Sequence, residues 1–263
     1  MPDNVRAQYA TNTNLVRRAN LHMAYGKRAW FPWLAKHMAL PDGANVLDVG
    51  CGPGWLWRRA ADSLPKGLRL TLVDTSEAMV AEATAALVDS RFEVDGVVAD
   101  AMDLPFEDQV FDAVSMMHML YHVPDVDRAL AEVERVLTPG GKVCVTTNTR
   151  DNLAELTGLS GQIFGTDPFD LAAKMFSLDD AVRVLTDRFS AAERFDNVED
   201  YHCDDPQIVM DFLLSMPPAN AGSDAEKAAL DTLVKEAFAE AGGVLVAQKQ
   251  TGLVIATKPE GGI

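Results

Sequence analysis

The sequence predicts an α/β fold, in which a mostly parallel β-sheet is covered by helices on both faces. Between residues 44 and 149, short apolar segments alternate with segments whose apolar residues recur at helical spacing. A glycine-rich turn follows the first apolar segment, and hydrophobic residues make up 48% of the 263-residue chain, enough to build a core. This alternation places the loops after the strands at one edge of the sheet, where such folds bind ligands.

The net charge of the chain disfavours two classes of binding partner. Lysine and arginine number 23 against 39 aspartates and glutamates, for a formal net charge of −16. Such a charge disfavours nucleic acids and anionic membrane surfaces, because both are bound largely through basic side chains. No apolar run approaches the roughly 20 residues that span a bilayer, and the N-terminus lacks the basic-then-apolar layout of a secretion signal.

The cysteines give little support to a disulfide or metal site. Cys51, Cys144 and Cys203 are far apart in the sequence and include no CxxC pair. This spacing predicts neither a disulfide framework nor a zinc ribbon. A thiolate trio for arsenite and an acidic site for a metal are alternatives that the spacing does not favour. We therefore expect no bound metal and a reducing, cytoplasmic location.

The predicted elements begin with a helix at residues 30–38, which a Pro-Asp-Gly break at residues 41–43 ends. Helices are also expected from Leu56 to Leu64, after the N-cap Ser76, and after the N-cap Asp125. Five strands are expected in order, each a short apolar run: 46–49, 68–73, 92–99, 111–116 and 142–147.

The second half of the chain is predicted to be mainly helical. Ser177 and Asp205 are expected to cap two helices, and apolar spacing marks a further helix at residues 230–241. Residues 244–246 and 253–256 are apolar runs on either side of a turn. They are expected to form a terminal hairpin that reverses the last strand of the sheet.

Acidic residues stand at the ends of three successive predicted strands. A glycine turn with the sequence DVGCGPG spans residues 48–54, Asp74 ends the second strand, and Asp100 ends the third. Glycines let the backbone turn sharply and approach a ligand closely, while Asp74 can accept both hydroxyls of a ribose. A dinucleotide-binding turn requires glycine where Trp55 stands, so the spacing favours a nucleoside-type ligand without a pyrophosphate over NAD.

In this order, the segments resemble the motifs of class I S-adenosylmethionine-dependent methyltransferases. VLDVGCGPG at residues 46–54 is similar to the first motif, LVDTS at 72–76 to the second, and ADAMDLPF at 99–106 to the adenine-contacting segment. Residues 111–141 are similar to the stretch that ends in the L-x-P-G-G turn. The resemblance covers residues 44–149 and is strongest to the small-molecule branch that includes the ubiquinone/menaquinone-biosynthesis C-methyltransferases.

The resemblance implies a Rossmann-like, seven-stranded, mostly parallel sheet with an antiparallel last strand and helical cap insertions. It divides one compact domain into an N-terminal helical cap (residues 1–43), a core that binds S-adenosylmethionine (44–149), and a remainder (150–263) that completes the sheet. Residues 150–176 and 202–242, together with the N-terminal cap, are expected to cover the carboxyl edge.

The resemblance also implies which residues contact the cofactor. Asp74 would bind the ribose hydroxyls, Asp100 and the Ala101 backbone would hold the adenine, and Met117 would pass beside the methyl group. The full implied set is Asp48, Gly50, Cys51, Gly52, Gly54, Asp74, Thr75, Asp100, Ala101 and Met117.

Two histidines after the fourth strand are the candidate catalytic residues. His118 and His122 lie four residues apart and have ordinary pKa values near neutrality, as a general base requires. Packing, or a hydrogen bond to a helix end, is the alternative role for each. Tyr121 is a candidate for positioning the acceptor. The segment also lacks the NPPY tetrapeptide of the nucleic-acid methyltransferases that modify amino groups, which disfavours that branch.

The remaining histidines and the N-terminal tyrosines are given different roles. His22, His37 and His202 are expected to be structural or surface groups. Tyr9 and Tyr25 are candidates to close over the cofactor from the N-terminal segment.

The predicted function is methyl transfer from S-adenosylmethionine to an oxygen, nitrogen or carbon atom of a small, partly apolar molecule. The product is S-adenosylhomocysteine, and the protein mainly aligns and desolvates the reactants. An NAD-type oxidoreductase, a non-catalytic cofactor-binding or scaffold protein, and a methyltransferase for a basic protein are the alternatives. The acceptor, the use of a general base and the oligomeric state stay open.

Overall fold

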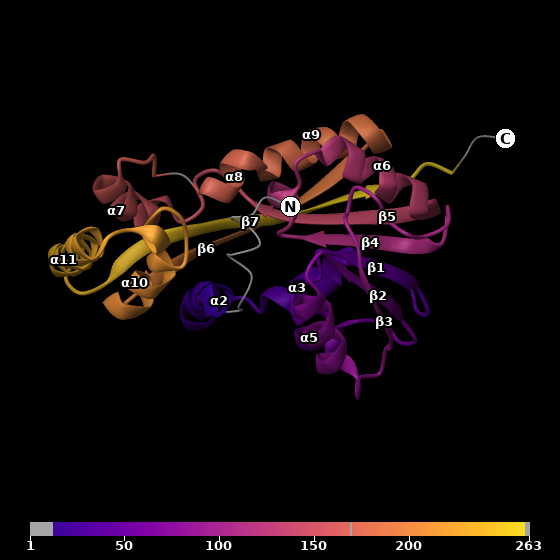
Figure 1. Ribbon diagram of the computed structural model, residues 1–263, viewed down its shortest axis with the longest axis horizontal. Helices are drawn as coiled ribbons and strands as arrows, with labels where there is room; N and C mark the ends of the chain where they lie inside the picture. The colour runs from indigo at the N-terminus through magenta and orange to yellow at the C-terminus, as the bar shows by residue number, and fades with distance from the viewer. Residues whose placement is uncertain (1–12, 169, 261–263) are drawn as a thin grey trace.

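The computed structural model describes residues 13–168 and 170–260, which form one seven-stranded sheet in the order β3-β2-β1-β4-β5-β7-β6 (Figure 1). The first five strands run parallel, while β7 is antiparallel to both β5 and β6. The predicted fold class is therefore confirmed. The strands are β1 (Asn45–Val49), β2 (Arg69–Asp74), β3 (Glu93–Val98), β4 (Phe111–Met117), β5 (Leu137–Asn148), β6 (Ala192–Cys203) and β7 (Leu245–Thr257).

Helices cover both faces of the sheet and gather at one end of it. In Figure 1, α6 and α9 lie above the sheet, α3 and α5 lie below it, and α7, α10 and α11 lie at the end. The helices are α2 (Thr13–Tyr25), α3 (Trp30–Met38), α4 (Trp55–Arg59), α5 (Glu77–Leu87), α6 (Val126–Val136), α7 (Ala154–Phe164), α8 (Leu171–Met175), α9 (Leu178–Phe189), α10 (Pro206–Leu214) and α11 (Asp224–Glu240). None of the described helices is long and apolar enough to cross a bilayer.

The predicted N-caps are confirmed by their hydrogen bonds. The side chains of Ser76, Asp125, Ser177 and Asp205 each accept a hydrogen bond from a backbone N–H in the first turn of the helix that follows. Such a bond satisfies one of the N–H groups that have no partner inside the helix. The local sequence thus determines where these four helices begin.

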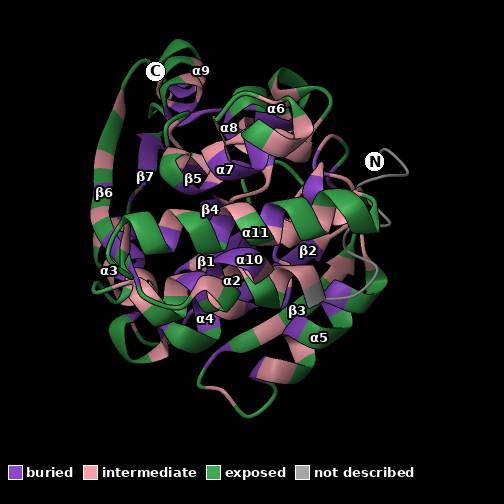
Figure 2. Ribbon diagram, turned by 90° about the vertical axis from the view of Figure 1, so that its left-hand side faces the viewer, coloured by how far each residue is buried: buried purple, intermediate pink, exposed green. Residues whose placement is uncertain are grey.

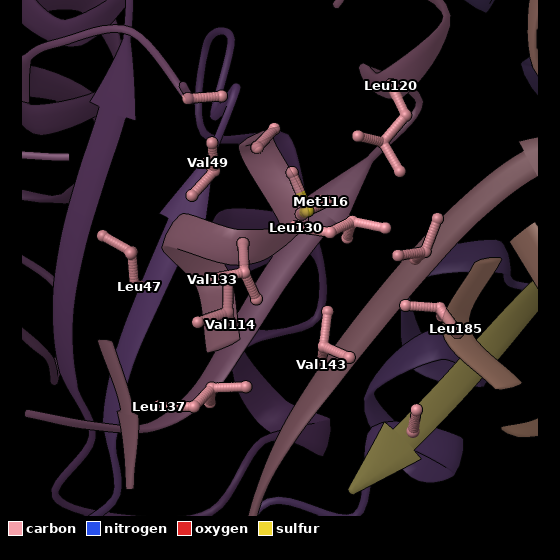
Figure 3. Packing of buried hydrophobic residues seen from close by; sticks show 14 of the residues in the cluster. Leu47, Val49, Val114, Met116, Leu120, Leu130, Val133, Leu137, Val143 and Leu185 are labelled. Carbon is pink, nitrogen blue, oxygen red and sulfur yellow. The ribbon is translucent and has the colours of Figure 1, made fainter. Parts of the chain in front are cut away.

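Two apolar clusters fix the helices on the two faces of the sheet. Leu130 and Val133 of α6 pack against Val114 and Met116 of β4, as Figure 3 shows. On the opposite face, Trp57 of α4 is fully buried in a second cluster with residues of α3, α5 and β2.

A third apolar cluster lies at the end of the sheet and builds the cap. It joins α2, α7, α10 and α11 to the ends of β6 and β7, where Tyr201 and Ala247 are buried. Because β6 and β7 are long, they extend from the sheet into this cluster (Figure 1). The cap is therefore anchored to the sheet through these two strands.

The predicted terminal hairpin is wrong. Residues 245–257 form the single strand β7, which pairs along its length with β6, a strand that was not predicted. Gly252 does not mark a turn: a Cβ there would lie 2.6 Å from Leu178 and 2.7 Å from the Phe195 carbonyl, so glycine lets α9 lie close on the strand. β6 is an edge strand (Figure 2), and its charged, exposed residues interrupt the apolar ones, which hides it from a search for apolar runs.

Two other boundaries also differ from the prediction. The helix expected to reach Leu64 ends at Arg59 and is followed by a short 3-10 turn at Ala61–Ser63. The fifth strand begins at Leu137 rather than residue 142, with a register shift opposite Phe111 and Ala113.

Candidate active site

A cavity of about 820 Å³ opens at the carboxyl edge of the sheet. Its lining comes from the loops that follow β1 to β4, from α2, α3 and α10, and from β6 and β7. Ligand sites in proteins commonly measure 300–1,000 Å³, so this cavity lies in the upper part of the range. It has room for a nucleoside-type ligand and a second small molecule.

The structure brings together nearly all the predicted site residues. His118, His122, Tyr121 and every predicted cofactor residue except Gly54 line the cavity. Gly54 has a φ of 69°, and a Cβ there would lie 3.2 Å from the Cβ of Ala83. Its role is therefore to let α4 begin close against α5, away from the cavity.

The glycine turn after β1 is held from below and open toward the cavity. The N–H groups of Gly50 and Cys51 both donate to the Val73 carbonyl, at 2.7 and 2.9 Å. A Cβ on Gly50 would lie 2.8 Å from the Cβ of Met119, whereas a Cβ on Gly52 would meet no atom within 4 Å. The turn is thus packed on one side and leaves free space beside Gly52 on the other.

Asp74 lies at the tip of β2 with its carboxylate beside this turn. One oxygen accepts from the Gly52 N–H at 3.2 Å and the other from the Ser76 N–H at 2.9 Å. Each carboxylate oxygen has two lone pairs, so both retain acceptor capacity. Asp100, at the end of β3, likewise accepts from the Met102 N–H at 2.9 Å.

Asp48 is a buried carboxylate beneath the glycine turn. Burial raises its pKa to about 6, although hydrogen bonds from Ser115 and Trp57 act in the opposite direction. The Trp57 Nε1–H donates at 2.7 Å, and the Ser115 hydroxyl donates to the other oxygen. Trp57 and Ser115 were not predicted as site residues, yet they hold Asp48 in place at the cavity floor.

The expectation that His118 and His122 titrate near neutrality is wrong. Burial lowers the pKa of both to about 4, with a further contribution from Lys249 at His118 and from Arg18 at His122. Both imidazoles are therefore neutral at pH 7: each can accept a proton but binds it weakly. His118 also has a φ of 53°, and its backbone N–H donates to the Thr146 carbonyl at 3.0 Å.

His22, expected to be a structural or surface group, has a structural contact and also lines the cavity. Its Nδ1 lies 3.0 Å from the Tyr201 hydroxyl, and burial, followed by the charge of Lys249, lowers its pKa to about 3. The signal that finds it is helical spacing, since one face of α2 lines the cavity with Leu15, Arg18, Ala19 and His22.

Tyr25 does not take the predicted position over a cofactor. The hydroxyl of Tyr25 accepts from the Asp205 N–H at 3.0 Å, which fastens α2 to the start of α10, and the residue is not part of the cavity lining. Tyr9 lies outside the described residues.

The acidic and sulfur-bearing residues form no metal site in the described part of the chain. Asp170 accepts hydrogen bonds from the side-chain amides of Asn148 and Asn152, at 2.8 and 3.0 Å. The three cysteines are buried and unpaired. Among residues 13–168 and 170–260, no three His, Cys, Asp or Glu side chains converge as metal ligands do.

A family model for a methyltransferase domain matches residues 47–145. This segment of the chain is therefore similar to a methyltransferase domain. The resemblance predicted over residues 44–149 is thereby confirmed, and the matched segment is the part that supplies the glycine turn and the acids at the strand ends.

Known proteins resemble this chain in sequence and in fold. The ubiquinone/menaquinone biosynthesis C-methyltransferase of Bordetella parapertussis is 36% identical over 146 residues, which are 56% of this chain and 54% of that protein. The chain thus spans about half the length of the curated relatives it matches.

Two solved structures share the fold of this chain. One is the phosphoethanolamine N-methyltransferase 2 of Haemonchus contortus, in complex with S-adenosylhomocysteine. It has a TM-score of 0.54 and 19% identity, over 98% of this chain and 59% of that chain. The other is the [4+2]-cyclase SpnF, with a TM-score of 0.52 and 24% identity, over 88% of this chain and 81% of that one. A cyclase shares the fold, so the fold alone does not decide the reaction.

Proposed function

We propose that this protein transfers the methyl group of S-adenosylmethionine to a small, partly apolar acceptor. One observation carries the proposal: the glycine turn, Asp74 and Asp100, from three successive strand ends, meet in one cavity, and all of them lie in the segment that matches the methyltransferase model. The names of the relatives, which include a C-methyltransferase and an N-methyltransferase, support the same reaction type.

The residues of the cavity fit this cofactor. Asp74 has acceptor capacity left for two neighbouring hydroxyls, and the free space beside Gly52 admits a ligand close to the backbone. Asp100 and Ala101 lie where an adenine amino group can be held. When bound, the cofactor supplies a sulfonium methyl group that a nucleophile displaces in line.

The work of the protein is then positioning and exclusion of water. Met117 and His118 line the cavity after β4, where the acceptor and the methyl group would meet. A neutral His118 can hydrogen-bond an acceptor or take its proton as the new bond forms. Alignment of the reactants supplies most of the rate in such a reaction. We assign His118 a catalytic role and His122 a supporting one.

The second candidate function is an oxidoreductase that uses NAD on the same sheet. Trp55 stands where the dinucleotide-binding turn needs its third glycine, and it begins α4 directly. This position weighs against NAD. We also place the reaction in the cytoplasm, because the three cysteines are unpaired.

The test is to identify the small molecule that binds. Mass spectrometry of molecules released from freshly purified, denatured protein should find S-adenosylmethionine or S-adenosylhomocysteine. Added S-adenosylhomocysteine should raise the melting temperature, because a ligand that binds only the folded state stabilises it, whereas NAD should not. A shift with NAD alone would overturn the cofactor assignment, and no response to either would favour a non-catalytic scaffold.

A further inference from the structure

We propose that the acceptor carries an acidic oxygen group, a carboxylate or a phenolate, that pairs with the ammonium group of Lys249 while its apolar body lies against Trp30. This inference rests on the proposed function and names the class of acceptor. Lys249 is on β7, four strand positions away from β2, which carries Asp74. At about 4.8 Å per strand, the two residues are roughly 19 Å apart across the sheet, so they mark two ends of one cavity.

Lys249 is a buried cation that has no hydrogen-bond or ion-pair partner among the described residues. Its exposed fraction is only 7%, and it lines the cavity. It stands at an inward position of β7, in line with the buried Ala247 and Thr251. In the described part of the chain, its Nζ makes no hydrogen bond and no ion pair. A buried lysine in this condition is unusual, since charged groups are seldom buried unless they are paired.

Glu199, the residue expected to neutralise Lys249, forms hydrogen bonds with other groups. Glu199 of β6 lies directly opposite Lys249 in the β6–β7 register, where opposite charges usually pair. Instead, one oxygen of Glu199 accepts the backbone N–H groups of Lys27 and Arg28, at 2.8 and 3.1 Å. The glutamate therefore holds the segment between α2 and α3, and the ammonium group is left facing the cavity.

What does contact Lys249 is the face of Trp30, whose ring centroid lies 4.6 Å from Nζ. An aromatic face attracts a cation. It is not a conventional acceptor for the three hydrogen bonds that an ammonium group can donate. The other charged groups nearby include Arg28, whose charge adds to the effect of burial in lowering the pKa of Lys249 to about 8, while Glu199 opposes it. An anionic ligand is the partner this site lacks.

The same contacts place such a ligand beside the methyl donor. Trp30 contacts Lys249 on one side, and its ring centroid lies 6.2 Å from that of His118 on another. An acceptor anchored by its acidic oxygen on Lys249 would extend over Trp30 toward His118. Phe212 and Met216 of the cap line the same cavity and give apolar surface for its body. The acidic group is thus an anchor, and the atom that is methylated lies at the other end of the molecule.

The experiment compares an acid with a neutral analogue of the same shape. Isothermal titration calorimetry would measure 2-naphthoate against 2-naphthamide, and 4-nitrophenolate against 4-nitroanisole, at neutral pH. Each titration is made with the free protein and with the protein saturated with S-adenosylhomocysteine. We expect the natural protein to bind at least one anion tenfold or more tightly than its neutral analogue, and the pair that shows this preference identifies the acidic group.

Three variants assign that preference to Lys249. Lys249→Met keeps the length of the side chain and should abolish the preference, whereas Lys249→Arg keeps the charge and should retain much of it. Lys36→Met is the matched control, since Lys36 is an exposed lysine of α3 and loses the same charge. A preference that is absent or undetectable in the natural protein, or that persists in Lys249→Met, would overturn the inference.

The inference and the proposed function fail in different ways. Lys249→Met should bind S-adenosylhomocysteine within about twofold of the natural protein, because Lys249 lies far from the glycine turn. Loss of the anion preference with cofactor binding intact confirms Lys249 as the anchor. Equal binding of acid and neutral analogue beside normal cofactor binding refutes only the acceptor class. Failure of the natural protein to bind S-adenosylhomocysteine at all refutes the proposed function.

Discussion

At the scale of single residues, Asp74 is the side chain whose contacts most clearly await a ligand. Its two oxygens each hold one backbone N–H and keep further acceptor capacity at the cavity. We expect Asp74→Ala to weaken S-adenosylhomocysteine binding at least tenfold, or about 1.4 kcal/mol, measured by calorimetry. Asp62→Ala removes the same charge from an exposed position and serves as the control. Unchanged affinity in Asp74→Ala would remove Asp74 from the site.

His118 calls for a variant that respects its backbone. Its φ of 53° lies in the left-handed region, which asparagine tolerates better than alanine does. With the first acceptor found by screening, His118→Asn should lower turnover by about 10²-fold, the usual contribution of a proton-transferring group. Its affinity for S-adenosylhomocysteine should change little. A variant as fast as the natural protein would leave His118 with a packing role only.

At the scale of elements, two glycines in the turn between β1 and α4, Gly52 and Gly54, have different roles. Gly52 and Gly54 both have positive φ, so alanine at either position costs about 1 kcal/mol in backbone strain. Gly54→Ala must also displace Ala83 of α5, and we expect a larger total loss of about 2 kcal/mol. Gly52→Ala instead fills the free space at the cavity. Denaturant unfolding should rank Gly54→Ala as the less stable variant, and calorimetry should rank Gly52→Ala as the weaker binder of S-adenosylhomocysteine. A reversed order would mean that the two glycines have been assigned the wrong roles.

The elements also show where a sequence pattern fails. β1, β2 and β4 contain buried apolar residues and were predicted close to their observed bounds, whereas β5 begins five residues earlier than predicted. β6 is an edge strand in which charged, exposed residues interrupt the apolar ones, so it carries no continuous apolar signal. The break expected within β7 came from the residues around Gly252, which in the folded protein make room for Leu178. The same misassignment placed Lys249 in a turn, so Lys249 was not predicted as a site residue.

At the scale of the whole molecule, the cavity wall makes stability depend on pH. The pKa values of the cavity histidines are lowered from 6.5, to about 3 for His22 and about 4 for His118 and His122. In the unfolded chain these groups take a proton below about pH 6.5, but the folded protein keeps them neutral. Their contribution to stability is therefore complete above pH 6.5 and is lost as the pH falls toward 4.

Asp48 acts in the opposite direction, and the balance can be estimated. Its pKa is raised from 3.8 to about 6, so the folded state takes a proton first and gains stability as the pH falls below 6. Between pH 6.5 and pH 5, the stability lost through the three histidines exceeds the stability gained through Asp48. At about 1.4 kcal/mol per pH unit and group, we expect the melting temperature at pH 5 to be lower than at pH 7.5 by on the order of 10 °C.

Differential scanning calorimetry at the two pH values measures this change. His22→Gln removes one of the titrating groups while keeping a side chain that can reach the Tyr201 hydroxyl. This variant should show a smaller fall in melting temperature between pH 7.5 and pH 5. An identical fall in both proteins would mean that His22 does not contribute to the pH dependence.

The sequence by itself determined the parallel core, the helix caps and the end of the cavity to which we assign the cofactor. These features depend on short-range rules: the period of apolar residues, the first-turn hydrogen bonds of a capped helix, and the turn that glycines allow between β1 and α4. The order of those segments along the chain was enough to predict the family and to place Asp74 and Asp100 at one edge.

Only the tertiary structure decided the acceptor end of the site. His22, Trp30, His118 and Lys249 come from α2, α3, the end of β4 and β7, and no local pattern links them. Their properties are also set by distant parts of the chain, because burial and neighbouring charges lower the pKa of His118, and the segment between α2 and α3 takes Glu199 away from Lys249. In our proposal, Lys249 becomes a binding group only because folding buries its ammonium group away from water and holds Glu199 away from it.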